Sequence, residues 1–204
     1  MKKRIIILSI LPVLLFWLLT GCSSDKSGSD QSQQDESTEV QDEISQEEVT
    51  TTEQDKSKRP SPPQTASLKI GDLEITLNYS SPGVKGRNIW GELVPYGEVW
   101  RTGANEANVF SVSKDVLING EALPAGKYAL FTIPGKSEWT VIFNKEWNQW
   151  GSFNYHESED ALRISVTPQQ EDELKERMEF RVNENGEVSF RWENLSFTFS
   201  VASS

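Results

Sequence analysis

The sequence predicts an all-β domain of mainly antiparallel strands over residues 65–204, a β-sandwich or partly closed barrel with one short helix. Short runs of alternating apolar and polar residues recur there, as in strands with one buried face. Turn sequences separate these runs, and strands do not alternate with helices as they do around a parallel sheet. Together these observations favour packed sheets joined by hairpins.

The first predicted strand covers residues 73–79, where Leu73, Ile75, Leu77 and Tyr79 alternate with polar residues. Its apolar side chains fall on one face, so one side of the strand is expected to be buried. Comparable runs follow at residues 109–112, 127–133, 139–143, 162–166, 178–182, 188–192 and 195–201.

Three turn sequences, Asn119-Gly120, Pro134-Gly135 and Asn185-Gly186, are predicted to join neighbouring strands. Asn-Gly adopts the positive φ angles that two-residue hairpins need, so we expect antiparallel pairing around these turns.

A short helix is predicted at residues 169–177, because three acidic residues at 171–173 precede Lys175 and Arg177. Early acids and late bases suit the dipole of a helix.

The first 21 residues have the pattern of a bacterial lipoprotein signal peptide. Basic residues at 2–4 precede an apolar run at 5–19, and Thr20-Gly21 precede Cys22. This run has 15 residues and contains Pro12. A membrane-spanning helix needs about 20 residues, so a cleaved signal is favoured over an anchor helix.

Cys22 occupies the position that resembles the lipidated cysteine of the bacterial lipobox, and it is the only cysteine of the chain. A single cysteine cannot form an intramolecular disulfide. We therefore expect acyl chains such as palmitate on Cys22, and a lipid bilayer as its partner. Two or three chains give durable attachment. The domain would lie in the cell envelope, either in the periplasm or at the cell surface.

Residues 22–64 are predicted to be a disordered tether. From residue 23 to 59 the chain has 11 acidic and 4 basic residues and very few large apolar ones, too few to form a core. A flexible chain of this length spans roughly 35 Å. The proline-rich residues 60–63 stiffen its end. We interpret the tether as a spacer, or alternatively as a signal for export to the cell surface.

Charge and residue counts exclude several functions. Residues 60–204 contain 20 acidic and 13 basic residues, and no basic patch indicates nucleic-acid binding. The single histidine, His156, makes a serine triad and a zinc site improbable on composition alone, and no metal or cofactor is expected. Calcium at Glu157, Glu159 and Asp160 is a weaker alternative, since the spacing of a known calcium loop is missing.

Residues 79–106 interrupt the alternation and concentrate glycine, aromatic residues and arginine in one long connection. Such loops are usually functional, or are packed by their own side chains.

This segment resembles an uncharacterised bacterial lipoprotein family, domain of unknown function 2911. The matching elements are Tyr79–Pro82, Lys85–Arg87, Leu93–Gly97 and Trp100–Ala107, followed by residues 124–128, 139–144 and 150–151. Two positions depart from the family pattern: Trp90 stands where phenylalanine is expected, and His156 where an acid is expected. The resemblance implies an extracytoplasmic β-rich domain and no assigned activity.

The leading hypothesis for this segment is a site for glycans or small polar molecules. Aromatic residues would supply a platform, and the polar residues would supply directional hydrogen bonds. The candidate residues are Arg87, Trp90, Tyr96, Trp100, Arg101, Asn105 and Glu106.

Three alternatives remain open from the sequence. An envelope hydrolase would use Glu92 or Glu106 as acid or base, with Arg101 holding an anionic substrate. Alternatively, Arg87 and Arg101 pair with Glu92 or Glu106 and only pin the loop. A third possibility is a structural partner in envelope assembly.

Overall fold

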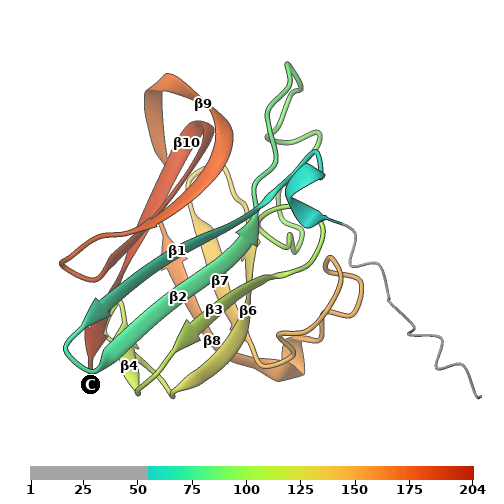
Figure 1. Ribbon diagram of the computed structural model, residues 1–204. Helices are drawn as coiled ribbons and strands as arrows, with labels where there is room; N and C mark the ends of the chain where they lie inside the picture. The colour runs from blue at the N-terminus through green and yellow to red at the C-terminus, as the bar shows by residue number, and fades with distance from the viewer. Residues whose placement is uncertain (1–54) are drawn as a thin grey trace, which may run out of the picture. The chain divides into compact units, whose positions relative to one another are not determined.

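The computed structural model describes residues 55–204, which form ten strands and two short 3₁₀ helices (Figure 1). The predicted signal peptide, Cys22 and tether residues 22–54 lie outside the described residues. The strands are β1 (Pro63–Ile70), β2 (Leu73–Ser80), β3 (Asn108–Val112), β4 (Val116–Ile118), β5 (Glu121–Leu123), β6 (Gly126–Ile133), β7 (Trp139–Asn144), β8 (Asp160–Val166), β9 (Gln169–Val182) and β10 (Glu187–Ser203). The 3₁₀ helices are η1 (Lys56–Lys58) and η2 (Glu157–Glu159).

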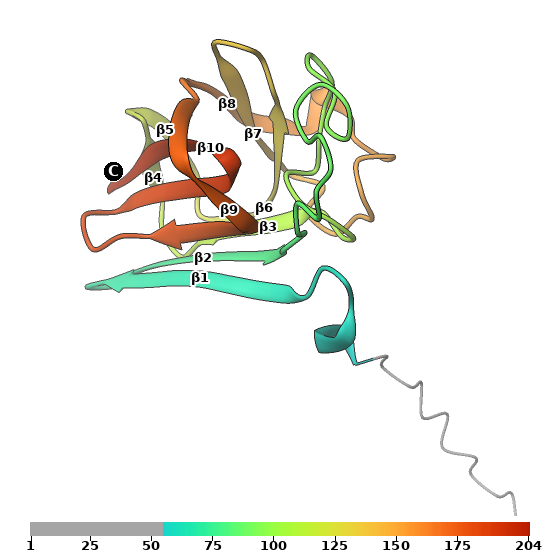
Figure 2. The ribbon, with the colours of Figure 1, turned by 90° about the horizontal axis from the view of Figure 1, so that it is seen from above.

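The strands form two antiparallel sheets that pack as a β-sandwich, which confirms the predicted class. One sheet has the order β1-β2-β3-β6-β7-β8 and the other the order β5-β4-β10-β9. In Figure 2 the hairpin of β9 and β10 lies against the side of the molecule formed by β1 and β2. The described residues contain no closed barrel, so the sandwich is the correct alternative of the two.

Strand β1 was not among the strands predicted from the alternation. It pairs with β2 along its whole length, from Pro63 opposite Ser80 to Ile70 opposite Leu73. Because β1 is an edge strand, most of its residues are exposed and the apolar alternation is weak. Ordered structure therefore begins before residue 65, the predicted boundary, and includes the last residues of the predicted tether.

The predicted turns lie between strands as expected. Asn119 and Gly120, with φ angles of 50° and 91°, join β4 to β5, where Ile118 faces Glu121. Gly186 has a φ angle of 80° in the turn between β9 and β10. The positive angles explain why these positions carry Asn and Gly.

The helix predicted at residues 169–177 is wrong, because this segment belongs to strand β9. It pairs with β10 from Gln169 opposite Ser196 to Lys175 opposite Glu193. Between these pairs β9 carries extra residues, and the polar stretch 171–173 bulges out of register. The order of its charged residues, acids before bases, is typical of a helix. The segment is nevertheless a strand, because its backbone pairs with β10.

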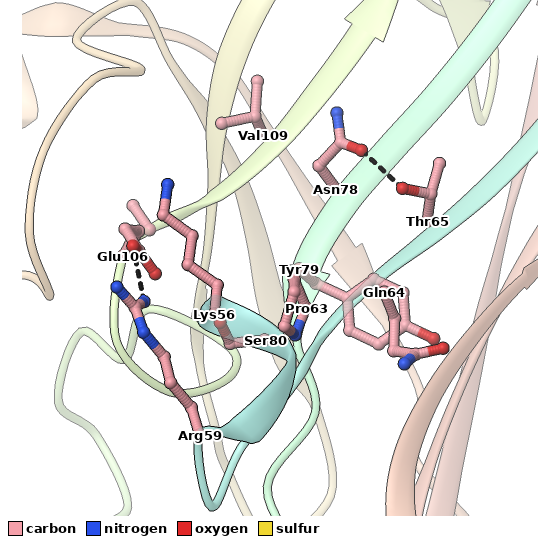
Figure 3. A pocket seen from close by; sticks show the side chains of 11 residues that line it. Lys56, Arg59, Pro63, Gln64, Thr65, Asn78, Tyr79, Ser80, Glu106 and Val109 are labelled. Atoms are coloured by element: carbon pink, nitrogen blue, oxygen red, sulfur yellow. Dashed lines mark hydrogen bonds and ion pairs between the residues drawn. The ribbon is translucent and has the colours of Figure 1, made fainter. Parts of the chain in front are cut away.

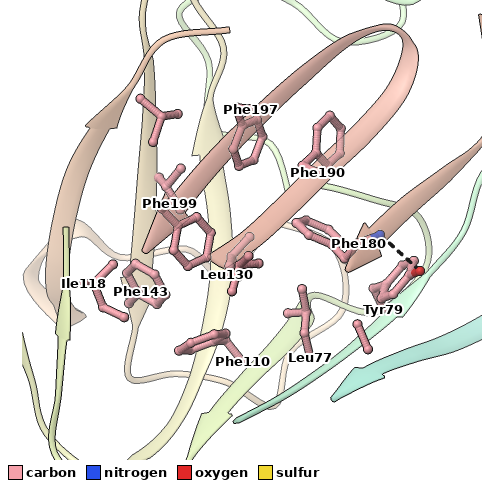
Figure 4. Close-up of a cluster of buried hydrophobic side chains, with 14 of the residues drawn as sticks. Leu77, Tyr79, Phe110, Ile118, Leu130, Phe143, Phe180, Phe190, Phe197 and Phe199 are labelled. Atoms are coloured by element: carbon pink, nitrogen blue, oxygen red, sulfur yellow. Dashed lines mark hydrogen bonds between the residues drawn. The ribbon is translucent and has the colours of Figure 1, made fainter. Parts of the chain in front are cut away.

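A core rich in aromatic side chains lies between the two sheets (Figure 4). Phe110 and Phe143 of the larger sheet both meet Phe199 of the smaller one, at centroid distances of 6.1 and 5.7 Å. Phe190 stacks on Phe197 at 4.7 Å. Rings from both layers interlock, which fixes how the sheets face each other.

The long connection between β2 and β3 closes one side of this core. Trp90 meets Trp139 of β7 at 4.9 Å and Trp192 of β10 at 5.8 Å, so its indole lies between the sheets. Just after β2, Val84 donates to the carbonyl of Glu176 in β9, which links the two sheets at this edge. No helix among residues 55–204 is long and apolar enough to cross a membrane.

Candidate functional site

The structure does not bring the seven predicted site residues together. Trp90 and Trp100 belong to the core, where Trp100 stacks on Trp192 at 5.8 Å with an interplanar angle of 17°. The indole nitrogen of Trp90 donates to Glu193 at 3.0 Å. These two rings are already covered by other side chains, so the predicted aromatic platform does not form.

Arg87 and Glu92 are used within their own segment. The guanidinium of Arg87 donates to the carbonyl oxygens of Val84 and Gly83, at 3.0 and 2.5 Å. Glu92 accepts from the side chain of Asn88 at 2.9 Å and is exposed. The Arg–Glu pairs expected to pin the loop are therefore not the ones present.

Tyr96 is partly exposed, and its ring lies against Gly91, where any added Cβ would be only 3.1 Å away. A φ angle of 87° at Gly91 adds a second reason for glycine there. Neither Tyr96 nor Gly91 lines the groove described below.

Arg101 is half buried, and its Nε atom has no hydrogen-bond partner among residues 55–204. It follows Trp100, whose backbone exchanges two hydrogen bonds with Thr132 of β6. Burial lowers the pKa of the Arg101 guanidinium, since desolvation disfavours the charged form.

Asn105 and Glu106 do meet a common partner, the short segment that leads into β1. The amide of Asn105 donates to the carbonyl oxygen of Ser61 at 3.1 Å and to the hydroxyl of Ser80 at 3.2 Å. Glu106 accepts from Arg59 at 2.8 Å. We call residues 56–62 the strap, because these contacts hold them across the ends of β2 and the loop before β3.

A groove of about 490 Å³ lies between the strap and the outer face of β1, β2 and β3 (Figure 3). Lys56, Arg59 and Glu106 lie together on one side of the groove, where Arg59 contacts Glu106, and Asn78 and Thr65 lie on the other side. On the sheet, the hydroxyl of Thr65 donates to the side-chain amide oxygen of Asn78 at 2.7 Å. This bond leaves the Asn78 amide nitrogen without a partner among the described residues, so it can donate to a ligand.

Glu106 is ionised in this setting. Partial burial raises its pKa, but the hydrogen bond from Arg59 and the nearby charge of Lys56 outweigh it, and the pKa lies below its ordinary value. Its side chain is 42% exposed, so part of it is accessible to solvent. An ionised, accessible carboxylate accepts hydrogen bonds from ligand hydroxyl groups.

Trp150 lies directly beside Glu106 on a neighbouring strand segment. Ala107 donates to the carbonyl of Gln149 at 3.0 Å, and Gly151 donates to the carbonyl of Asn105 at 3.1 Å. In this pattern Glu106 and Trp150 form a non-hydrogen-bonded antiparallel pair, in which facing side chains approach closely on one face. Trp150 is 55% exposed, so an open aromatic ring stands next to the carboxylate.

A partly buried polar network holds the loop that carries Trp150. Asp160 accepts from Tyr155 at 2.7 Å, from Arg163 at 2.6 Å and from Asn144 at 2.8 Å. Burial, followed by the hydrogen bond to Asp160, raises the pKa of Tyr155 to about 12, so the phenol stays protonated. Because each polar group has partners, this network fixes the loop rather than offering a reactive group.

Sequence reasoning missed Arg59, the strap and the role of Trp150. Arg59 was assigned to the tether, and nothing local indicates that it reaches Glu106, 47 positions along the chain. In the sequence Trp150 belongs to the family pattern and to a cluster with Trp147, Asn148 and Gln149 near Tyr155, but nothing there links it to Glu106. No group of histidine, cysteine, aspartate and glutamate residues within the described part of the chain could hold a metal ion.

The family model described as a protein of unknown function, DUF2911, matches residues 61–201. No curated protein and no solved structure matches the chain.

Proposed function

The chain belongs to the DUF2911 family, and we propose that it is an extracytoplasmic lipoprotein whose β-sandwich binds a glycan or another small polar molecule in the groove at Glu106. Cys22 would carry the acyl chains, and the tether would let the domain reach ligands near the membrane. The observation that carries the proposal is the pairing of a partly exposed carboxylate that lines the groove with an exposed indole beside it, Glu106 next to Trp150.

Sugar rings present an apolar face and a rim of hydroxyl groups. The indole of Trp150 offers a surface for the apolar face. The carboxylate of Glu106 accepts from hydroxyl groups, while the amide nitrogen of Asn78 donates to ring or carbonyl oxygens. All three groups belong to elements with paired backbones, so little ordering is needed on binding.

A hydrolase that uses Glu106 as its general acid is not favoured. Such an acid needs a raised pKa, whereas the pKa of Glu106 is lowered by Arg59. Glu92 is exposed and bonded to Asn88, and it lines no part of this groove.

The binding proposal is tested by thermal shift of the full-length protein in detergent, with N-acetylglucosamine as the ligand. Glu106→Gln keeps the shape of the side chain but removes the charge, and we expect it to abolish the ligand-induced rise in melting temperature. Glu92→Gln, an exposed acid of the same segment, is the matched control and should retain the rise. An equal rise in both variants would contradict the proposal.

The anchoring part of the proposal is tested separately by Cys22→Ala. We expect this protein to remain an unprocessed precursor or to leave the membrane fraction, because the acylation site is lost. Normal processing with full membrane retention would contradict lipidation at Cys22.

A further inference from the structure

A second hollow lies next to the Glu106 groove, on the loop formed by residues 145–156. Its volume is about 530 Å³, and it is lined by Trp147, by the amides of Asn148, Gln149 and Asn154, and by Glu146 and His156. Both hollows fall in the range of roughly 300–1,000 Å³ that is usual for small-molecule sites.

This loop exposes large aromatic side chains to solvent. Trp147 is 39% exposed, Trp150 is 55% exposed and Phe153 is 85% exposed. The ammonium of Lys127 lies over the ring of Trp147 in a cation–π contact, 5.0 Å from the ring centroid. Exposed aromatic residues gathered on one loop are a common mark of a binding surface.

The loop is rigid enough to act as a preformed site. Its first residue, Lys145, donates to the carbonyl of Glu159 at 2.9 Å, and His156 contacts Glu146 at 3.0 Å across the loop. Beneath it, Asn144 is fully buried and donates both to Asp160 and to the carbonyl of His156. The aromatic residues are therefore exposed on a pinned loop.

The two hollows are linked by a backbone hydrogen bond. Ala107 lines the first hollow and Gln149 lines the second, and their backbones are hydrogen-bonded at 3.0 Å. Trp150 follows Gln149 and pairs with Glu106, so its exposed indole lies beside a lining residue of the first hollow, although Trp150 itself lines neither hollow. An extended ligand that spans both hollows can also reach the exposed indole of Trp150 beside Glu106.

We propose that the two hollows together bind a linear, neutral, N-acetylated glycan chain, with one sugar ring on the exposed indole of Trp150 beside Glu106. This inference rests on the proposed function and names its ligand class. Amide side chains in both hollows suit acetamido groups, and aromatic faces suit the sugar rings. A polyanionic chain is disfavoured by the net charge of −7 on residues 60–204.

A chain that occupies both hollows binds more tightly than a single sugar, because the second contact becomes intramolecular. The test is calorimetric titration of the full-length protein in detergent with N-acetylglucosamine monomer, trimer and hexamer. We expect the hexamer to bind at least about tenfold more tightly than the monomer.

Variants separate the two hollows. Trp147→Ala in the second hollow should abolish the gain with chain length, so that the hexamer binds no more tightly than the monomer, whereas Glu106→Gln should weaken binding at every length. Leu174→Ala, an exposed residue of β9, is the control and should bind like the wild type.

Each outcome decides between the two proposals. Equal affinity for monomer and hexamer, still lost in Glu106→Gln, would overturn the extended site and keep the Glu106 groove. Binding of none of the three sugars would overturn both.

Discussion

Replacement of Trp100 by alanine distinguishes a core residue from a binding residue. In the structure its indole stacks on Trp192, and it meets Trp90 at 6.0 Å and Phe190 at 6.3 Å, both edge to face. Removing it leaves a cavity beside three aromatic rings, so Trp100→Ala should destabilise the domain rather than only weaken a ligand contact.

The size of the effect follows from the contacts that are lost. Truncation of a buried tryptophan costs about 3–5 kcal/mol. Because Trp100 is only partly buried, we expect a value near the lower end, about 3 kcal/mol. With a urea dependence of about 2 kcal/mol per molar, the unfolding midpoint should fall by about 1.5 M.

Urea unfolding followed by far-ultraviolet circular dichroism measures this loss without relying on the fluorescence of the deleted residue. Trp150→Ala is the matched control, since that indole is 55% exposed and its cost should stay within about 0.5 kcal/mol. If Trp100→Ala unfolded at the wild-type urea concentration, the assignment of Trp100 to the core would be refuted.

Three further predictions concern titration and backbone geometry. Because the folded-state pKa of Glu106 is lowered, its contribution to stability is present above its ordinary pKa of 4.5 and is lost as pH falls through the folded value. The stability difference between wild type and Glu106→Gln should therefore shrink in acid denaturation series below about pH 4.5, and a constant difference would contradict the Arg59 pair. The raised pKa of Tyr155, about 12, predicts that the free energy of unfolding declines as pH rises from 10 towards 12, and that Tyr155→Phe flattens this decline. Chemical denaturation across this pH range measures the decline. An identical dependence on pH in the variant would count against the network. Gly186→Ala should be much more destabilising than Gly71→Ala: both glycines have positive φ, but a Cβ at Gly186 would overlap the carbonyl oxygen of Val201, whereas Gly71 faces open space. Thermal melts of the two variants measure the difference, and equal melting temperatures would contradict the close approach.

The strands could be predicted because alternation is a local property. Leu73, Ile75 and Leu77 are each buried, as their spacing requires, and the Asn119-Gly120 turn has the backbone angles that its residues favour. The helix prediction for residues 169–177 was wrong because the order of charges is only local evidence, whereas pairing with β10 depends on the distant residues 187–203.

The site was only partly predictable for a related reason. Trp100 and Trp150 are the same residue type, and only the packing of distant strands shows that one is covered and the other exposed. Glu106 was identified from its segment. Its partner Arg59, however, comes from a polar stretch whose composition resembles a tether.

The central claim is that a polar ligand contacts Trp150 and Trp147 beside Glu106. It is tested most directly by the indole NH signals of the full-length protein in a two-dimensional NMR titration with the N-acetylglucosamine hexamer. We predict that the signals of Trp147 and Trp150 shift on titration, while those of the buried Trp139 and Trp192 stay in place. Signals of Trp147 and Trp150 that do not move at saturating hexamer would contradict the claim.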